Sequence, residues 1–148
     1  MKRILYVRSG PYQLDLDSYN SQELGLATAL NELGFSCDIM CYTSGKNRDE
    51  IIENSGVKIK VLWRKGIRLL RSGIYPMILK KSFLSEYDIV ICSEYSQIMS
   101  VLLLWRHKNV YIYNGPYYNL FKIKFLEPIY DKLFCKYINK RAKKVFCK

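Results

Sequence analysis

The sequence predicts an α/β domain with a doubly wound parallel sheet, and two observations carry this prediction. Short apolar segments alternate with segments of helical periodicity along the whole chain. Most of the apolar segments lack a regular polar alternation, as expected for strands that helices cover on both sides. A length of 148 residues, 49% of them hydrophobic, suits one domain with its own core, so residues 1–148 are expected to form a single domain.

The first half of the chain supplies three expected strands and two expected helices. The strands are residues 4–7, 37–42 and 57–62. The third of them alternates in polarity (VKIKVLW), which indicates an edge strand or a face toward solvent. Asn20 or Ser21 can cap the first helix, which ends at Gly34. A short second helix is expected at residues 48–54, with Gly56 as its stop.

The second half continues the same alternation, with strands expected at residues 89–92, 110–113 and 145–147. Pro76 suits the first turn of a helix that runs to about residue 84, and residues 96–105 form another. After Pro116, apolar residues recur at helical spacing, and Pro128 interrupts this region. Strand–helix units in this order predict a parallel sheet of six or seven strands with helices on both faces, a Rossmann-like architecture.

The opening of the chain is its most specific segment. KRILYVRSG, PYQLDLDSYNSQ and ELGLATALNELGFSCDIMCYT form a strand, a polar loop, and then a helix, glycine and second strand. This order places a loop at the carboxyl end of the first strand, where open parallel sheets bind ligands. Together with NVYIYNGPYYN, the pattern resembles the amino-terminal, acceptor-side half of a family-4-like glycosyltransferase of the GT-B type. The resemblance covers the whole chain as an architecture.

The resemblance implies a function that is shared between two domains. Such an enzyme moves a sugar from a nucleoside-diphosphate sugar to an acceptor hydroxyl, here on a lipid-linked or surface glycan. The donor is held mainly by a carboxyl-terminal domain, which the same chain or another chain would supply. We therefore expect residues 1–148 alone to be inactive in transfer, and we expect no cofactor besides the nucleotide-sugar substrate.

The resemblance also points to residues in the loop after the first strand. Family members carry a glycine pair there, and in this chain Asp17 and Ser18 stand in its place. Backbone amides at the helix start, near Tyr19 and Asn20, can face an anion. In the alternative interpretation, this loop merely caps the helix.

Other candidate residues follow the first, fourth and fifth strands. Gly10 shapes the loop around the expected site. Glu94 is the candidate catalytic carboxylate, which would contact an acceptor hydroxyl; alternatively, it is an acid favoured by a helix start. Tyr113 and Asn114 stand where many family members have a histidine. Asn114 and Tyr117 are candidate substrate contacts, although the Gly-Pro pair between them also suits a turn. Residues 9–22, 93–95 and 114–117 are expected to line one cleft.

The charge of the chain favours an anionic partner. There are 24 basic and 13 acidic residues, a net charge of +11, and no Asp or Glu lies between Ser55 and Ser85. The stretch RKGIRLLRSGIYPMILKK mixes cations with apolar residues, which suits an anionic membrane surface. A core-packed helix with a charged outer face is the alternative. The expected membrane contacts are Arg64, Lys65, Arg68 and Arg71.

Two further functions stay open. The chain can be a non-catalytic, membrane-docking subunit that pairs with a separate donor-binding chain. Less favoured is a basic nucleic-acid-binding domain: its 13 Tyr residues allow base stacking, but the sequence carries no recognised motif.

The remaining residues exclude several classes of site. One histidine without ligand spacing predicts no metal site, and His107 is expected in a surface loop at the opposite edge of the sheet. Five cysteines without a C-x-x-C pair indicate free, mostly buried thiols in a reducing cytosol. With no signal peptide and no spanning segment, the expected location is cytoplasmic, with peripheral membrane attachment as an option.

Overall fold

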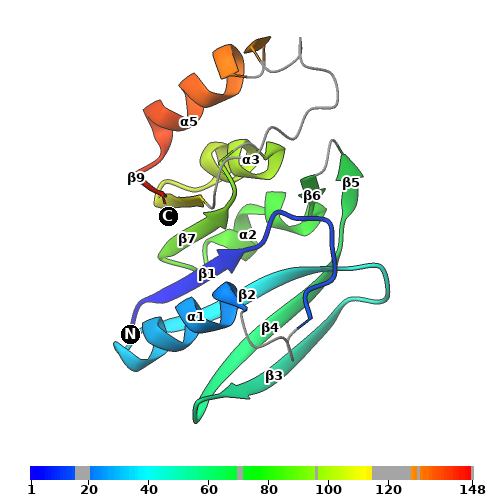
Figure 1. The fold of residues 1–148 in the computed structure, drawn as a ribbon, viewed down its shortest axis with the longest axis vertical. Coiled ribbons are helices and arrows are strands. Elements are labelled where there is room, and N and C mark those ends of the chain that lie inside the picture. Colours follow the sequence, from blue (N-terminus) through cyan, green and yellow to red (C-terminus); the bar gives the residue numbers. More distant parts are fainter. Residues whose placement is uncertain (16–20, 70–71, 96, 115–127, 130, 148) are drawn as a thin grey trace.

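A seven-stranded sheet in the order β3-β4-β2-β1-β7-β8-β9 forms the centre of the molecule (Figure 1). The structure is a computed structural model that describes residues 1–15, 21–69, 72–95, 97–114, 128–129 and 131–147. All neighbouring strands are parallel except β3, which runs antiparallel to β4. This mixed α/β arrangement with helices on both faces is compatible with a Rossmann-like fold, as predicted.

The parallel strands contain the segments that the sequence predicts. They are β1 (Arg3–Val7), β2 (Ser36–Thr43), β4 (Val57–Lys65), β7 (Ile89–Ser93), β8 (Val110–Asn114) and β9 (Lys144–Cys147). From the central β1 the chain first winds outward through β2 to β4, and later outward again from β7 to β9. The direction of winding reverses between β1 and β7, which is the topological switch point of such a sheet.

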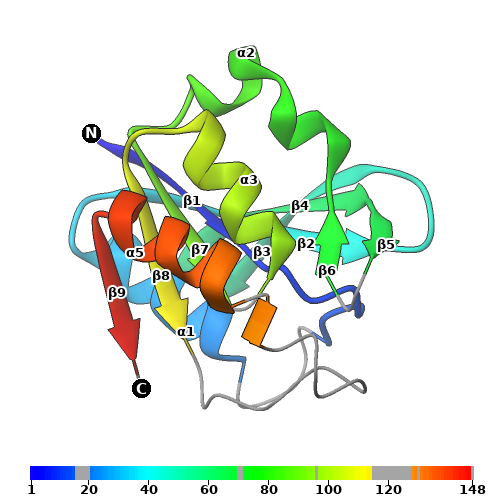
Figure 2. The ribbon, with the colours of Figure 1, turned by 90° about the horizontal axis from the view of Figure 1, so that it is seen from above.

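Helices cover both faces of the sheet, as Figure 2 shows. On one face lies α1 (Gln22–Glu32). On the other lie η1 (Pro76–Leu79), α2 (Lys81–Leu84), α3 (Ile98–Arg106) and α5 (Lys136–Arg141), the last preceded by the π-helical turn η2 (Asp131–Cys135). Ser21 caps α1 by accepting a hydrogen bond from the Leu24 amide at 3.3 Å, and Gly34 ends it with a φ of +84°.

Each face of the sheet has its own apolar core, because alternate side chains of a strand point to opposite faces. On the α1 side, Leu24 and Ala27 belong to a cluster with strand residues such as Ile39. On the other side, Leu103 of α3 belongs to a cluster with strand residues such as Leu5. The strands are therefore buried between two helical layers.

Residues 48–54 form a strand, so the prediction of a short helix there is wrong. In β3 (Arg48–Asn54) the register runs from Arg48↔Trp63 to Asn54↔Val57 of β4. Ser55 and Gly56, with φ values of +54° and +79°, form the tight hairpin turn between them. RDEIIEN has helix-compatible residues, but pairing with β4 overrides that preference. β4 therefore pairs with β3 on its outer side, and β3, not β4, is the edge strand of the sheet.

The described part of residues 64–81 does not form the single core-packed helix that is the alternative interpretation of this stretch. After β4, the short strands β5 (Ile67–Leu69) and β6 (Ser72–Ile74) make a two-stranded sheet. The helix expected from Pro76 is divided, because the backbone is extended at Lys80 between η1 and α2. Most of the helical region expected after Pro116 lies outside the described residues.

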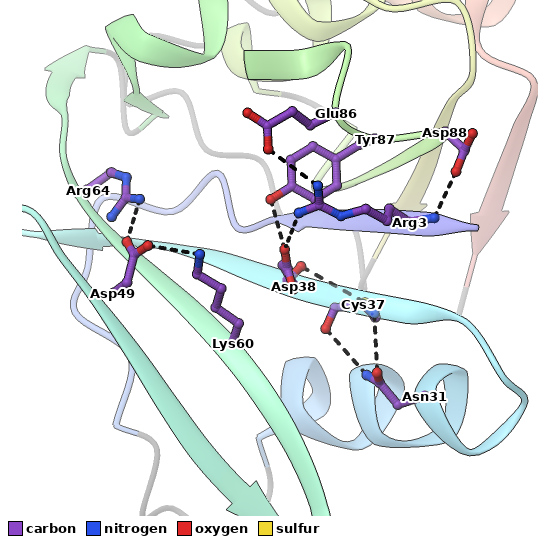
Figure 3. Close-up of polar contacts among 10 residues, drawn as sticks. All are labelled: Arg3, Asn31, Cys37, Asp38, Asp49, Lys60, Arg64, Glu86, Tyr87 and Asp88. Atoms are coloured by element: carbon purple, nitrogen blue, oxygen red, sulfur yellow. Dashed lines mark hydrogen bonds and ion pairs between the residues drawn. The ribbon is translucent and has the colours of Figure 1, made fainter. Parts of the chain in front are cut away.

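Polar contacts fix the amino end of β1 to its neighbours (Figure 3). Arg3 forms ion pairs with Asp38 of β2 and with Glu86, each at 3.3 Å, and its amide donates to Asp88 at 2.8 Å. The Tyr87 hydroxyl donates to Asp38 at 2.9 Å, and the Arg3 guanidinium lies 4.7 Å from the centre of the Tyr87 ring. These contacts join β1, β2 and the segment before β7 at the amino ends of the strands.

Candidate functional site

The carboxyl ends of β1 and β7 meet at the switch point of the sheet. The Ser9 amide donates a hydrogen bond to Ser93 Oγ at 3.0 Å, and the Ser9 hydroxyl donates to the Ser93 carbonyl. Both serines are buried. Open parallel sheets bind ligands in the crevice beyond such a point, because the loops of the two neighbouring strands diverge from it.

Glu94 follows Ser93 and adopts a left-handed backbone with a φ of +74°. Its amide donates to the Tyr113 carbonyl at 3.1 Å, and its carbonyl accepts from Ser100 Oγ at 2.6 Å. The left-handed conformation costs a non-glycine residue about 1–3 kcal/mol, and it persists only where neighbouring contacts impose it. The half-buried Glu94 is thus a constrained acid at the carboxyl edge, where the sequence places the candidate catalytic carboxylate.

Arg8 and Glu23 form an ion pair whose charges act on the Glu94 carboxyl group. Arg8 Nε lies 2.9 Å from Glu23 Oε1, and the two side chains are 22% and 15% exposed. Desolvation raises the pKa of Glu94; the negative charge of Glu23 adds to the rise, while the positive charge of Arg8 opposes it. We call Arg8, Ser9, Glu23, Ser93 and Glu94 the switch-point site.

Two other hydrogen bonds hold Arg8 in place. Its Nη1 donates to the Tyr12 carbonyl at 2.9 Å, and its own carbonyl accepts from the Tyr75 hydroxyl at 2.6 Å. A hollow of about 340 Å³ is lined by Arg8 and Glu23 together with Gln13–Asp15 and Ser21–Gln22. A paired cation and carboxylate at the wall of a polar hollow are suited to bind a ligand rich in hydroxyl groups, although Glu94 is not among the residues that line this hollow.

Asn114 lies on the neighbouring strand end and is engaged with the backbone. Its Oδ1 accepts from the Tyr95 amide at 3.0 Å, and the Tyr95 hydroxyl donates to Asn139 Oδ1 at 2.8 Å. The side chain of Asn114 therefore joins the loop after β7 to the end of β8. Its amide nitrogen is the group suited to contact a ligand.

The other predicted substrate contacts are only partly placed. Gly10 lies directly after Ser9, half-buried beside the Tyr12 ring, at the base of the loop that follows β1. The remaining predicted contacts, Asp17, Ser18, Tyr19, Asn20 and Tyr117, lie outside the described residues.

Of the expected membrane residues, Arg64 has a different position from the one that the sequence suggests. Its side chain is 11% exposed and pairs with Asp49 of β3 (Figure 3). It also donates to the Arg48 carbonyl at 2.9 Å. Because it is buried and paired, Arg64 is not placed to contact a membrane, which corrects the expectation for this residue. Lys65 and Arg68 are exposed, and Arg71 lies outside the described residues.

Sequence reasoning missed Arg8 and Glu23. Arg8 directly follows β1 at the ligand-binding edge, and Glu23 lies in the first turn of α1. Position alone could have selected both. Their pairing, however, depends on how α1 packs over the sheet, which no local pattern encodes.

The cysteines agree with the prediction where they are described. Cys37, Cys41 and Cys92 are buried and form no disulfide, and Cys135 is half-buried. Burial raises the pKa of Cys37 and of Cys41 to about 12, so these thiols are poor nucleophiles.

Neither a metal site nor a similar protein helps to assign a function. In the described part of the chain, no group of three or more His, Cys, Asp or Glu side chains could hold a metal ion. None of the described helices has the length and apolar character needed to cross a bilayer. Comparisons with family models, curated proteins and solved structures find no match to this chain.

Proposed function

We propose that this domain is the acceptor-binding half of a GT-B-type glycosyltransferase. The reaction moves a sugar from a nucleoside-diphosphate sugar to a hydroxyl of a lipid-linked or surface-glycan acceptor. The observation that carries the proposal is Glu94, a backbone-constrained acid with a raised pKa at the switch point of the sheet. Perturbed acids of this kind concentrate at functional sites.

In this proposal, the residues of the switch-point site divide the work of holding the acceptor. Glu94 accepts a hydrogen bond from the reacting hydroxyl, and its raised pKa makes the carboxylate a better proton acceptor. Arg8, fixed by Glu23, orients a second polar group of the sugar. A second domain supplies the donor site, since one wall of a cleft cannot exclude water or align two substrates.

An exposed patch beside the site favours a lipid-linked acceptor. The hairpin patch consists of Tyr12, Lys65, Ile67, Arg68 and Leu69. Its apolar members are well exposed: Tyr12 54%, Ile67 60% and Leu69 47%. Apolar side chains interleaved with cations suit the headgroup region of an anionic membrane.

The hairpin patch is tied directly to the switch-point site. The Gly73 amide of β6 donates to the Ser9 carbonyl at 2.7 Å, and β6 pairs with β5, which carries Ile67 and Leu69. Membrane docking through this hairpin would bring lipid-borne sugars to Glu94. The same observation favours the second candidate function, a non-catalytic docking subunit that presents acceptor to a separate donor-binding chain.

Sugar binding tests the proposal. Saturation-transfer NMR with glucose, galactose, mannose and N-acetylglucosamine should detect weak binding of at least one sugar. Glu94→Gln should weaken it by about fivefold or more, because a charged hydrogen-bond acceptor is lost. Glu53→Gln, an exposed acid of β3, is the matched control and should bind as the unchanged chain does. If no sugar binds, or if both variants lose binding equally, the proposal is wrong.

A transfer assay tests the division between two domains. Residues 1–148 alone should show no turnover of nucleotide sugars with added acceptor, and a donor-binding domain should restore it. Robust turnover by residues 1–148 alone would contradict the two-domain assignment. Sugar binding without turnover after the donor domain is supplied would select the docking-subunit alternative.

A further inference from the structure

A second hollow, of about 570 Å³, lies at the edge of the sheet opposite the switch-point site. Lys108 precedes β8 and Lys143 precedes β9, so both lie at the amino ends of parallel strands. Lys81 enters from the start of α2, Arg106 from the end of α3, and Arg141 from the end of α5. We call these five cations, together with Trp105, the basic hollow.

The basic hollow concentrates positive charge without compensation. Five Lys and Arg side chains line it, and none of its lining residues is acidic. Within the described ranges of the chain, none of these cations forms an ion pair with a carboxylate. Like charges gathered in a concave wall repel one another and focus a positive potential, so an anion bound there relieves the repulsion.

Arg106, which lines this hollow, has a donor without a partner among the described residues. Its guanidinium lies 4.0 Å from the centre of the Trp105 ring, which fixes the plane of the charged group. Its Nε is buried and forms no hydrogen bond with any described residue. Buried donors are normally paired, so this lining residue carries an unsatisfied donor as well as an uncompensated charge.

The single histidine adds shape to the hollow but not charge. His107 Nδ1 accepts from the Asn109 amide at 3.2 Å, which leaves Nε2 to donate to the Tyr87 carbonyl at 3.0 Å. Both ring nitrogens are thus committed to backbone groups, and the arrangement corresponds to a neutral imidazole. The positive charge of the hollow comes from its Lys and Arg side chains.

We infer that the basic hollow binds a ligand that carries two linked phosphate groups. Phosphate oxygens match the planar donors of Arg and the point charges of Lys. A single phosphate would leave most of the five cations uncompensated, whereas a diphosphate can reach cations from several elements at once. This inference goes beyond the proposed function, because the hollow and the acceptor site lie at opposite edges of the sheet.

Calorimetry with pyrophosphate at low salt tests the inference. The unchanged chain should bind pyrophosphate more tightly than inorganic phosphate. Lys108→Ala with Lys143→Ala should weaken pyrophosphate binding by about tenfold or more, since two charged hydrogen-bond donors are lost. Lys46→Ala with Lys58→Ala removes the same charge from exposed positions elsewhere and should change binding less than twofold. Equal losses in the two double variants, or no binding by the unchanged chain, would overturn the inference.

Tryptophan fluorescence locates the ligand without altering a cation. Trp105 is 59% exposed in the hollow, whereas Trp63, the other tryptophan, is 2% exposed. Pyrophosphate should change the emission of the unchanged chain in a saturable way, and Trp105→Phe should abolish this change. A response that survives in Trp105→Phe would place the ligand elsewhere and refute the assignment.

Two further arms identify the source of the phosphate. Vesicles of phosphatidylcholine with a polyprenyl diphosphate test a lipid headgroup: binding that pyrophosphate displaces, and that Lys108→Ala with Lys143→Ala weakens, supports the inference with a lipid ligand. Pyrophosphate binding without vesicle binding supports it with a free diphosphate. Single-stranded RNA that binds through the same lysines and that pyrophosphate cannot displace would overturn it.

Discussion

Among individual residues, Glu94 combines a left-handed backbone with a partly desolvated carboxyl group. The φ of +74° is imposed by hydrogen bonds of its own backbone to Tyr113 and Ser100. Glycine adopts this conformation without steric cost, whereas alanine does not. Strain that persists beside a candidate site suggests that the side chain is retained for its chemistry.

Replacing Glu94 by glycine separates this strain from function. We expect Glu94→Gly to be more stable than Glu94→Ala by about 1 kcal/mol, because only glycine removes the strain. Urea unfolding of the two variants measures the difference. Both should lose sugar binding, since neither has the carboxylate. Greater stability of the alanine variant would show that the backbone at this position is unstrained.

The raised pKa of Glu94 predicts that this residue makes the stability of the protein fall as the pH rises. A group whose pKa is higher in the folded state than in the unfolded state contributes stability at low pH and loses it as pH rises through the folded pKa. Compared with Glu94→Gln, the unchanged chain should therefore lose stability as the pH rises above the ordinary value of 4.5. Urea midpoints of both proteins at a series of pH values measure this. A constant difference, or a gain with rising pH, would contradict the prediction.

Among the elements, the β3–β4 hairpin depends on an unusual turn. Ser55 and Gly56 both have positive φ, as in a type I′ turn, where Asn-Gly is the preferred pair. Ser55→Asn should therefore stabilise the protein by about 0.5 kcal/mol. Thermal unfolding or urea unfolding measures the gain. Ser44→Asn, in an exposed loop without positive φ, is the control, and an equal gain there would refute the explanation.

The short β5–β6 hairpin predicts a specific mode of membrane contact. Ile67→Ser with Leu69→Ser should weaken binding to anionic vesicles by about tenfold, because the exposed apolar side chains no longer insert. Arg68→Ala should cost about 1 kcal/mol, an effect that salt reduces. Vesicle sedimentation at low and high salt measures both effects.

The edge strand β3 offers a matched control for the hairpin. Ile51→Ser removes an aliphatic side chain that is 71% exposed but lies outside the hairpin patch. It should leave vesicle binding unchanged. Equal binding to neutral and anionic vesicles, or an equal loss in Ile51→Ser, would exclude docking through the hairpin.

For the molecule as a whole, the sequence predicts the buried parts better than the exposed ones. The parallel strands are recognisable because burial on both faces requires continuous apolar segments. β3 is not, because an exposed edge strand carries charged residues that equally suit a helix. Arg64 could not be placed correctly without β3, since its burial depends on Asp49.

The candidate site likewise has residues that the sequence could select and residues that it could not. The rule that ligands bind at the carboxyl ends of parallel strands was enough to select Glu94 and Asn114. The Arg8–Glu23 pair depends on the packing of α1 against the sheet, and the basic hollow depends on three helices and two strand ends lying together. Such juxtapositions arise from tertiary structure, and no local periodicity encodes them.

The central position of β1 has a consequence for biosynthesis. β1 pairs with β2 on one side through Arg3↔Ser36 and with β7 on the other through Ile4↔Ile89. As the chain emerges from the ribosome, β1, β2 and the β3–β4 hairpin can assemble first, while the other edge of β1 has no partner until β7 is made. β7, β8 and β9 then add one after another, in the order of translation. We therefore expect the nascent half-sheet, whose β1 edge is unpaired until β7 is made, to be the stage of synthesis most prone to edge-to-edge aggregation.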